Sequence, residues 1–184
     1  MILAIDPGSS KSAFMTMSGV GQPMDFGIQD NDDLLDVVYA FNTHDLVIEM
    51  VACMGMAVGK TVFETVFWIG RFWEKSQSEV KQRVLRSDVK MAMCGNSRAK
   101  DVNIRQSLID RYGGEDIAIG GKKCTTCKGK GWTGRDHDSC PDCGSQGYIH
   151  PPGPLHGVSK DVWSALAVGC TYIDHNREGR EFRA

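Results

Sequence analysis

The chain has 184 residues, 41% of them hydrophobic, and a formal net charge of −2 at pH 7. This length and apolar share predict one domain with a buried core and room for a small inserted module, and they exclude a membrane span, because no apolar stretch approaches the roughly 18 residues that a span needs. Seven cysteines, with an N-terminus that reads as a strand and not as a signal peptide, favour reduced thiols in a cytoplasmic protein.

Strands and helices are predicted to alternate along most of the chain. Short apolar runs bounded by turn residues predict strands at 2–5, 13–17, 24–28, 46–49 and 83–86. Apolar residues at helical spacing predict helices at 31–41, 58–76, 89–93, 99–112 and 160–175. Three strands followed by alternating helices and strands indicate an α/β fold with a mixed β-sheet flanked by helices.

Two of the predicted strands, LAID and LVIE, end in carboxylates, Asp6 and Glu49. As neighbouring parallel strands they would place both acids at their carboxyl ends, where open α/β sheets build their sites. Two carboxylates this close repel each other unless they share a cation, and hard oxygen ligands select Mg²⁺ or Mn²⁺. This pattern therefore predicts a divalent metal site at that edge of the sheet.

A third acid, Asp161, stands at the start of the last predicted helix in SKDVWSALAVG. Ser159 is expected to cap this helix, which leaves Asp161 in its first turn, where the helix dipole favours negative charge. Each acid alone has a simpler interpretation, since Asp161 suits any helix start and Asp6 suits a turn before Pro7 and Gly8. The occurrence of three acids at the ends of hydrophobic elements favours the metal site.

The chain resembles the RuvC-type Holliday junction resolvases, which have the ribonuclease H-like fold. The matching segments, in the family's order, are AIDPGSSKSAF, LVIEM, GKTVFETVFWIGR, DVKMAMCGNSRAKDVNIRQSLI and KDVWSALAVG. The resemblance implies a metal-dependent endonuclease in which Asp6, Glu49 and Asp161 are the catalytic acids that bind Mg²⁺ or Mn²⁺. The family usually has another metal-binding acid one helical turn after the position of Asp161. This chain has Ser164 there, a weaker ligand, and this departure weakens the case for a second metal site.

Residues 71–105 carry nine Lys or Arg and four acids, a local charge of +5 in a chain whose total is close to neutral. Such side chains contact phosphates without reading sequence. In the family the region of GNSRAK lies close to DNA, so the resemblance makes Lys90, Arg98 and Lys100 the candidate DNA-binding residues.

The family also acts as two-fold dimers. The predicted helix at 58–76 has more aromatic surface around its sides than one buried face uses, and both a homodimer interface and a fully buried core helix stay open for it. The aromatic residues around its sides are Phe63, Phe67, Trp68 and Phe72.

Four cysteines, Cys124, Cys127, Cys140 and Cys143, have the spacing C-x₂-C-x₁₂-C-x₂-C. Two such pairs predict a closed tetrahedral structural Zn²⁺ site. The glycines that follow each pair resemble the zinc-binding repeats of DnaJ-type chaperones. We expect residues 121–150 to form an inserted zinc module in a nuclease core made of residues 1–120 and 151–184. It either clamps an arm of a DNA junction or holds the loop that carries Asp161.

The expected function is hydrolysis of Holliday junctions or other branched DNA. Two alternatives stay open: a nuclease of the same fold that cuts flaps, forks or RNA–DNA hybrids, and a non-catalytic protein that binds branched DNA, in which Ser164 marks decay of the metal site. An actin-like ATPase is disfavoured because a second phosphate loop is missing. Short resolvase-like chains are familiar in bacteriophages, which predicts a phage protein acting in the cytoplasm of its bacterial host.

Overall fold

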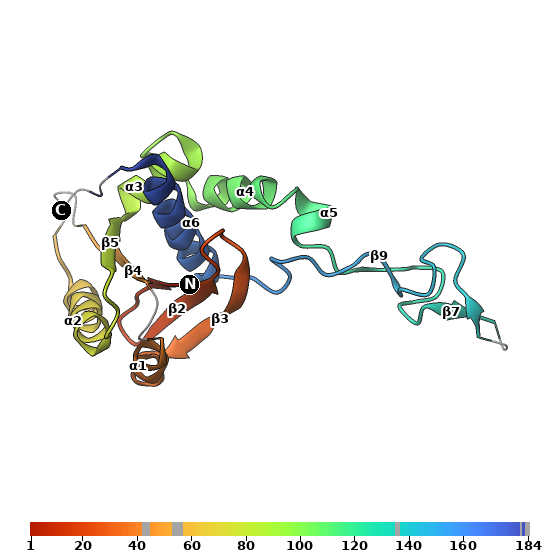
Figure 1. Ribbon diagram of the computed structural model, residues 1–184, viewed down its shortest axis with the longest axis horizontal. Helices are drawn as coiled ribbons and strands as arrows, with labels where there is room; N and C mark the ends of the chain where they lie inside the picture. The colour runs from red at the N-terminus through yellow and green to blue at the C-terminus, as the bar shows by residue number, and fades with distance from the viewer. Residues whose placement is uncertain (42–44, 53–56, 135–136, 181, 183–184) are drawn as a thin grey trace. The chain divides into compact units, whose positions relative to one another are not determined.

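The computed structural model of the protein (Figure 1) describes residues 1–41, 45–52, 57–134, 137–180 and 182. It divides into two compact units. One consists of Met1–Arg105 and Val158–Ala184, and the other of Gln106–Gly157, which contains the four cysteines. The division within the chain falls inside a helix, so the smaller unit begins earlier in sequence than the cysteine segment itself.

The first unit is built on one five-stranded sheet. Its strands are β1 (Ile2–Asp6), β2 (Lys11–Met17), β3 (Pro23–Asp30), β4 (Asp45–Met50) and β5 (Lys81–Leu85). They lie in the order β3-β2-β1-β4-β5, with antiparallel pairing among β1, β2 and β3 and parallel pairing of β1 with β4 and of β4 with β5. The predicted α/β fold with a mixed sheet is confirmed, and the two strands that end in acids are parallel neighbours.

Six helices are present among the described residues. They are α1 (Asn31–Ala40), α2 (Lys60–Lys75), α3 (Arg86–Cys94), α4 (Asp101–Arg111), α5 (Glu115–Ala118) and α6 (Val162–Glu178). None of the helices in the described part of the chain combines the length and the apolar character that crossing a bilayer requires. The short α5 was not predicted, because four residues between glycines show no helical period.

The start of α6 differs from the prediction. The helix begins at Val162, with Asp161 as its N-cap residue, and Ser159 lies outside it. Lys160 has a left-handed backbone with φ of 49°, which a right-handed helix cannot include. The expected capping role of Ser159 is therefore wrong, and Asp161 stands at the boundary of the helix instead of inside its first turn.

The alternation of side chains along β1 and β4 decides which face of the sheet carries the acids. Leu3 and Ile5 of β1 lie in a buried cluster with residues of α1 and α2. Ala4 points the other way and approaches Gly169 of α6. Successive side chains alternate between faces, so Asp6 belongs to the α6 side, and so does Glu49. Figure 1 shows α6 on one face of the sheet and α1 and α2 on the other.

Close packing of α6 on the sheet sets the position of its first turn. A Cβ added to Gly169 would lie 2.4 Å from the Met17 sulfur and 3.2 Å from the Ala4 Cβ, so only glycine permits this approach. The helix is buried almost continuously from Ala165 to Ile173. Its first turn is thus carried by a rigid, well-packed element.

The outer face of α2 is not covered within the described chain. Ile69 and Phe72 are buried against the sheet, whereas Phe63 is 66% exposed and Phe67 is 62% exposed. This excludes the alternative in which α2 is a fully buried core helix.

The second unit has little regular structure beyond its helices. Two short antiparallel pairs are present, β6 (Lys122–Lys123) with β9 (Tyr148–His150) and β7 (Trp132–Thr133) with β8 (Asp138–Ser139). The buried cluster of this region consists of the four cysteine side chains. Cysteines, and not a layer of large aliphatic residues, form the centre of the segment.

Candidate functional site

Asp6 and Glu49 lie side by side at the carboxyl edge of the sheet. The parallel register pairs Ile5 with Ile48, so each acid follows one residue later on its own strand. The residues that precede each acid on β1 and β4 are mostly buried and apolar. The two carboxylates therefore stand at the strand ends, where the sheet meets solvent. The prediction from LAID and LVIE placed these two strand ends together, and the structure does so.

A hydrogen-bonded clamp holds the turn that follows Asp6. The Asn31 side-chain amide donates to the Gly8 carbonyl oxygen at 3.0 Å, and the Ser12 hydroxyl donates to Asn31 Oδ1 at 2.6 Å. The Gly8 N–H in turn donates to Ser12 Oγ at 3.1 Å. Glycine is needed in the turn because a Cβ there would lie 2.2 Å from the Lys11 carbonyl oxygen. Sequence reasoning missed this clamp; its one local signal is a polar residue, Asn31, at the start of a predicted helix.

The first turn of α6 brings two more oxygen-bearing side chains to the same edge. Asp161 caps the helix without a capping hydrogen bond from its own side chain. Ser164, one turn later, donates a hydrogen bond from its hydroxyl to the Asp6 carboxylate. Glu49 of β4 and Asp161 and Ser164 at the start of α6 are therefore close enough to Asp6 to influence its carboxylate.

The charges at this edge oppose one another. The pKa of Asp6 is raised to about 7, mainly by burial and then by the neighbouring carboxylates of Glu49 and Asp161, which outweigh the opposite effects of Arg86 and the Ser164 hydroxyl. Burial also raises the pKa of Glu49, and Arg86 counteracts it. A divalent cation would relieve this repulsion, and the carboxylate oxygens are the ligands that Mg²⁺ and Mn²⁺ prefer.

Arg86 is the main residue of this site that the sequence did not reveal. It is the first residue of α3, directly after β5, and its guanidinium Nη1 lies 3.0 Å from Glu49 Oε2. Its Nη2 lies 2.6 Å from Asp101 Oδ1. Burial disfavours its charged form, but Glu49 and Asp101 hold the pKa of the guanidinium above its ordinary value. In the sequence, Arg86 is one of nine basic residues between positions 71 and 105.

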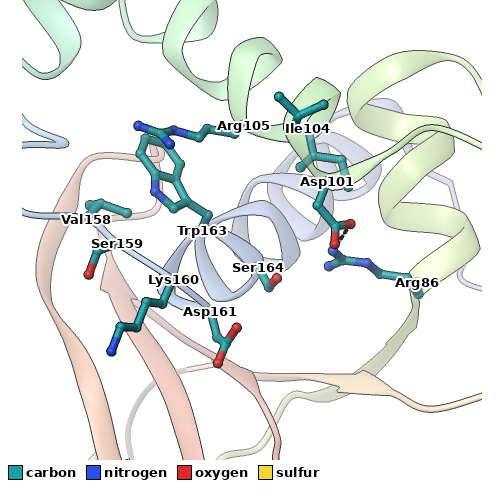
Figure 2. A pocket seen from close by; sticks show the side chains of 11 residues that line it. Arg86, Asp101, Ile104, Arg105, Val158, Ser159, Lys160, Asp161, Trp163 and Ser164 are labelled. Carbon is teal, nitrogen blue, oxygen red and sulfur yellow. Dashed lines mark hydrogen bonds and ion pairs between the residues drawn. The ribbon is translucent and has the colours of Figure 1, made fainter.

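A cavity of about 410 Å³ opens beside Asp161 and Ser164. Figure 2 shows the side chains of Arg86 and Asp101 meeting on one wall and Arg105 lying over the Trp163 ring on another. The Arg105 guanidinium carbon is 5.0 Å from the centre of that ring. The cavity offers cationic and hydroxyl groups to an anionic ligand next to the carboxylates. Its lining residues are Arg86, Asp101, Val102, Ile104, Arg105, Val158, Ser159, Lys160, Asp161, Trp163 and Ser164.

The three candidate DNA-binding residues lie on α3 and on the segment after it. Lys90 is half-buried on α3 and is close enough to Glu49 to lower the pKa of that carboxylate. Arg98 and Lys100 are exposed in the segment between α3 and α4. This segment is ordered by side-chain acceptors, with the Arg98 N–H donating to Asn96 Oδ1 at 2.9 Å.

Some of the other basic residues of 71–105 make structural contacts instead. Arg71 pairs with Asp32 at 3.2 Å and lies over the Trp68 ring. The Lys81 ammonium donates to the backbone carbonyls of Trp73 and Ser76 at 2.9 and 2.6 Å. The local charge of +5 is therefore divided between structural contacts and the candidate DNA-binding segment.

Among the described residues, the four cysteines are the one group of His, Cys, Asp or Glu side chains placed closely enough together to hold a metal ion as the chain stands. Their sulfur atoms all lie within 4.8 Å of one another. The Sγ atoms of Cys124 and Cys140 are 3.7 Å apart, as are those of Cys127 and Cys143. Four sulfurs at about 2.3 Å from a tetrahedral Zn²⁺ are about 3.8 Å apart, whereas a disulfide requires about 2.05 Å. The cluster fits a zinc ion and excludes these disulfides.

The glycines after each pair serve the cysteine cluster directly. The Gly131 N–H donates to Cys127 Sγ at 3.2 Å and the Gly147 N–H to Cys143 Sγ at 3.3 Å. Gly147 has φ of +77°, and a Cβ there would lie 2.6 Å from the Gly129 carbonyl oxygen. Both knuckles thus bring a backbone donor to a sulfur through a turn that only glycine adopts readily.

Comparisons with known proteins identify the fold. A scan against protein-family models finds no match, and a search of curated proteins finds none. Among solved structures, the chain is similar to Thermus thermophilus RuvC, with a TM-score of 0.56 and 14% identity over 97% of this chain and 96% of that one. It is also similar to T. thermophilus RuvC in complex with a Holliday junction substrate, with a TM-score of 0.57 and 12% identity over 97% and 95% of the two chains. The RuvC-type, ribonuclease H-like fold predicted from the motifs is confirmed.

Proposed function

We propose that the protein is a metal-dependent endonuclease that hydrolyses phosphodiester bonds in branched DNA, with the four-way Holliday junction as its first substrate. The observation that carries the proposal is that Asp6 stands at the carboxyl edge of a RuvC-type sheet with Glu49, Asp161 and Ser164 close enough to influence its carboxylate. One of the similar solved structures is a complex with a Holliday junction, and we extend that substrate to this chain as part of the proposal.

Asp6, Glu49 and Asp161 are the residues that would hold Mg²⁺ or Mn²⁺, and Ser164 would complete a second, weaker site. Bound there, such ions would supply activation of a water for in-line attack and stabilisation of the leaving 3′-oxygen. The protein contributes the placement: two strands and one helix hold the carboxylates, and the Ser164 hydroxyl orients Asp6. Because Asp6 has a pKa of about 7 without an ion, loading should strengthen as the pH rises through that value.

Cationic side chains near the acids supply the contacts to the DNA backbone. Lys90 lies near Glu49, and Arg98 and Lys100 extend from the segment between α3 and α4. Such contacts position the duplex arms without reading sequence, and their strength should fall steeply with added salt. The preference for branched DNA then comes from shape.

A cleavage assay tests the proposal. Labelled four-way junction, flap, fork and RNA–DNA hybrid substrates are incubated with the protein in Mg²⁺ and in Mn²⁺, and Asp6→Asn serves as the isosteric control. Paired symmetric nicks on the junction, absent in the variant, support the proposal. Cleavage of flaps, forks or hybrids alone replaces it with the related nuclease, and junction binding without metal-dependent cleavage replaces it with the non-catalytic protein.

We further propose a homodimer formed through α2, because paired nicks require two sites related by a two-fold axis. Phe63 and Phe67 are exposed on this helix, and Phe67 borders a groove of about 730 Å³ that also includes Leu35 and Tyr39. Sedimentation of the protein and of Phe67→Glu tests this: a dimer that becomes a monomer is expected, and a monomeric parent protein would contradict it.

We propose Zn²⁺ as the structural ion of the cysteine cluster and residues 121–150 as an inserted module of the nuclease. The cysteine sulfurs are too far apart for disulfides, and thiols stay reduced in a cytoplasm. We therefore propose that the protein is encoded by a phage and acts in the cytoplasm of its bacterial host. Metal analysis of the purified protein should give one zinc per chain.

A further inference from the structure

The Arg86 guanidinium links a buried carboxylate to an exposed one. Its two terminal nitrogens contact Glu49 at 3.0 Å and Asp101 at 2.6 Å at the same time. The Glu49 side chain is 13% exposed and the Asp101 side chain is 78% exposed. A planar guanidinium can hold both partners in fixed geometry, which a lysine ammonium cannot.

The fold places Arg86 at the acids for a simple reason. Strand β5 pairs parallel with β4, with Val84 opposite Glu49, and the chain turns into α3 at Arg86. The three parallel strands β1, β4 and β5 therefore bring Asp6, Glu49 and, directly after β5, Arg86 to the same edge of the sheet. The positive charge is close enough to Asp6 to influence that carboxylate as well.

We propose that Arg86 is a positioning residue, the internal counter-ion of Glu49, which competes with the divalent cation for that carboxylate and is released toward Asp101 when the cation binds. The inference rests on the proposed function, because it takes Glu49 to be a metal ligand. A buried carboxylate requires a partner charge, and in the ion-free protein Arg86 is that partner. A cation that takes Glu49 displaces this guanidinium, so Arg86 lowers the affinity of the site for the cation.

Asp101 decides how readily the displacement happens. Arg86 keeps one ion pair when it leaves Glu49, because Asp101 already holds its second nitrogen. Without Asp101, Glu49 would be the carboxylate that the guanidinium pairs with at this site, and the guanidinium would leave it less readily. Both residues line the cavity beside Asp161 and Ser164, where a released guanidinium faces the space available to a phosphate.

Mn²⁺ binding to the zinc-loaded full chain, measured by electron paramagnetic resonance, tests this without any cleavage step. Arg86→Met should bind Mn²⁺ about tenfold more tightly, because a positive charge next to the site is removed. Arg83→Met is the matched control: it changes the same charge on β5, where Arg83 is exposed over the Trp73 ring, and should shift the affinity less than twofold. A purely structural loss at Arg86 would weaken binding instead of strengthening it.

Asp101→Asn should weaken Mn²⁺ binding about threefold, and Asp110→Asn, the same change further along α4, should not. In an Arg86→Met background the effect of Asp101→Asn should disappear, because Asp101 acts through Arg86. If Arg86→Met does not fold, the Asp101→Asn comparison still decides, since it leaves Arg86 in place.

Asp6→Asn separates the failure of this inference from the failure of the proposed function. If Asp6→Asn abolishes Mn²⁺ binding while Arg86→Met leaves the affinity unchanged, the role of Arg86 is overturned and the metal site stands. If Mn²⁺ binding is indifferent to Asp6→Asn, the acids are not the metal site, and both proposals fall.

Discussion

The sheet edge around Asp6 and the four-cysteine segment are both suited to metal ions, but they are built in opposite ways. The acids come from distant parts of the chain and are positioned by a buried sheet and by α6. The cysteines come from one short stretch, and their own side chains are the buried cluster of that stretch.

This difference separates two uses of a metal. At the sheet edge the fold exists first and buries Asp6 beside other carboxylates, and burial first and then charge repulsion raise the pKa of Asp6. In the cysteine segment there is little apolar core, so the ion itself would provide the stabilisation. Replacing a metal-binding side chain should therefore stabilise the ion-free sheet edge around Asp6, whereas the same kind of change should unfold the cysteine segment.

Loss of zinc should have the largest effect. Structural Zn²⁺ sites contribute on the order of 10 kcal/mol at pH 7, so Cys127→Ser or a strong chelator should unfold the cysteine segment. Hydrogen exchange should show loss of protection in 122–150 while β1, β4 and α6 stay protected. Cys170→Ser, on α6 and outside the cluster, is the control. Equal loss of protection in both regions would break the comparison.

Replacing Asp6 should act in the opposite direction. The folded pKa of about 7 lies above the unfolded value of 3.8, so this group stabilises the ion-free protein fully below about pH 4, and that stability is lost as the pH rises to 7. Asp6→Asn should therefore raise the free energy of unfolding at pH 8 by about 2 kcal/mol, and at most about 4, with no gain at pH 4. Chemical denaturation with chelator at both pH values measures this.

Asp36→Asn, an exposed acid on α1, is the control for this pH dependence. Adding Mn²⁺ at pH 8 should stabilise the parent protein and not Asp6→Asn. A variant that is less stable than the parent at pH 8 would mean that Asp6 is satisfied without an ion.

The clamp behind Asp6 should contribute less. Asn31→Ala removes one buried and one partly buried hydrogen bond and should lower the free energy of unfolding by about 2 kcal/mol and slow cleavage, because the turn after Asp6 loosens. Ser12→Ala should act on the same network, so the double variant should lose less than the sum of the two. Additive losses would show that the two side chains act separately.

The smallest effect concerns which region touches DNA. Replacing Arg98 and Lys100 by alanine should reduce the salt dependence of junction binding by about one or two phosphate contacts. Lys122 and Lys123, exposed on β6 of the cysteine unit, form a matched pair with the same change of charge. A larger effect at Lys122 and Lys123 would move DNA binding to the cysteine segment and assign that segment the clamping role.

The local patterns were sufficient for much of the fold. Apolar runs and helical spacing predicted the five strands and the main helices close to their observed bounds, because these periods follow from backbone geometry within a few residues. The cysteine spacing likewise predicted a cluster whose sulfurs meet, since both pairs and their glycines lie in one short segment. The prediction that Ser159 caps α6 was wrong because the backbone of Lys160 is left-handed, a conformation that a lysine in the sequence does not predict.

The sequence by itself determined which residue types stand at the strand ends, and so that Asp6 and Glu49 carry carboxylates to one edge. Only the tertiary structure decided that Arg86 pairs with Glu49, that Asn31 holds the turn after Asp6, and that Phe63 and Phe67 stay uncovered. The physical reason is the range of the interactions. A hydrophobic period depends on residues close together in the sequence, whereas an ion pair between the ends of two strands depends on which strands are neighbours in the folded sheet.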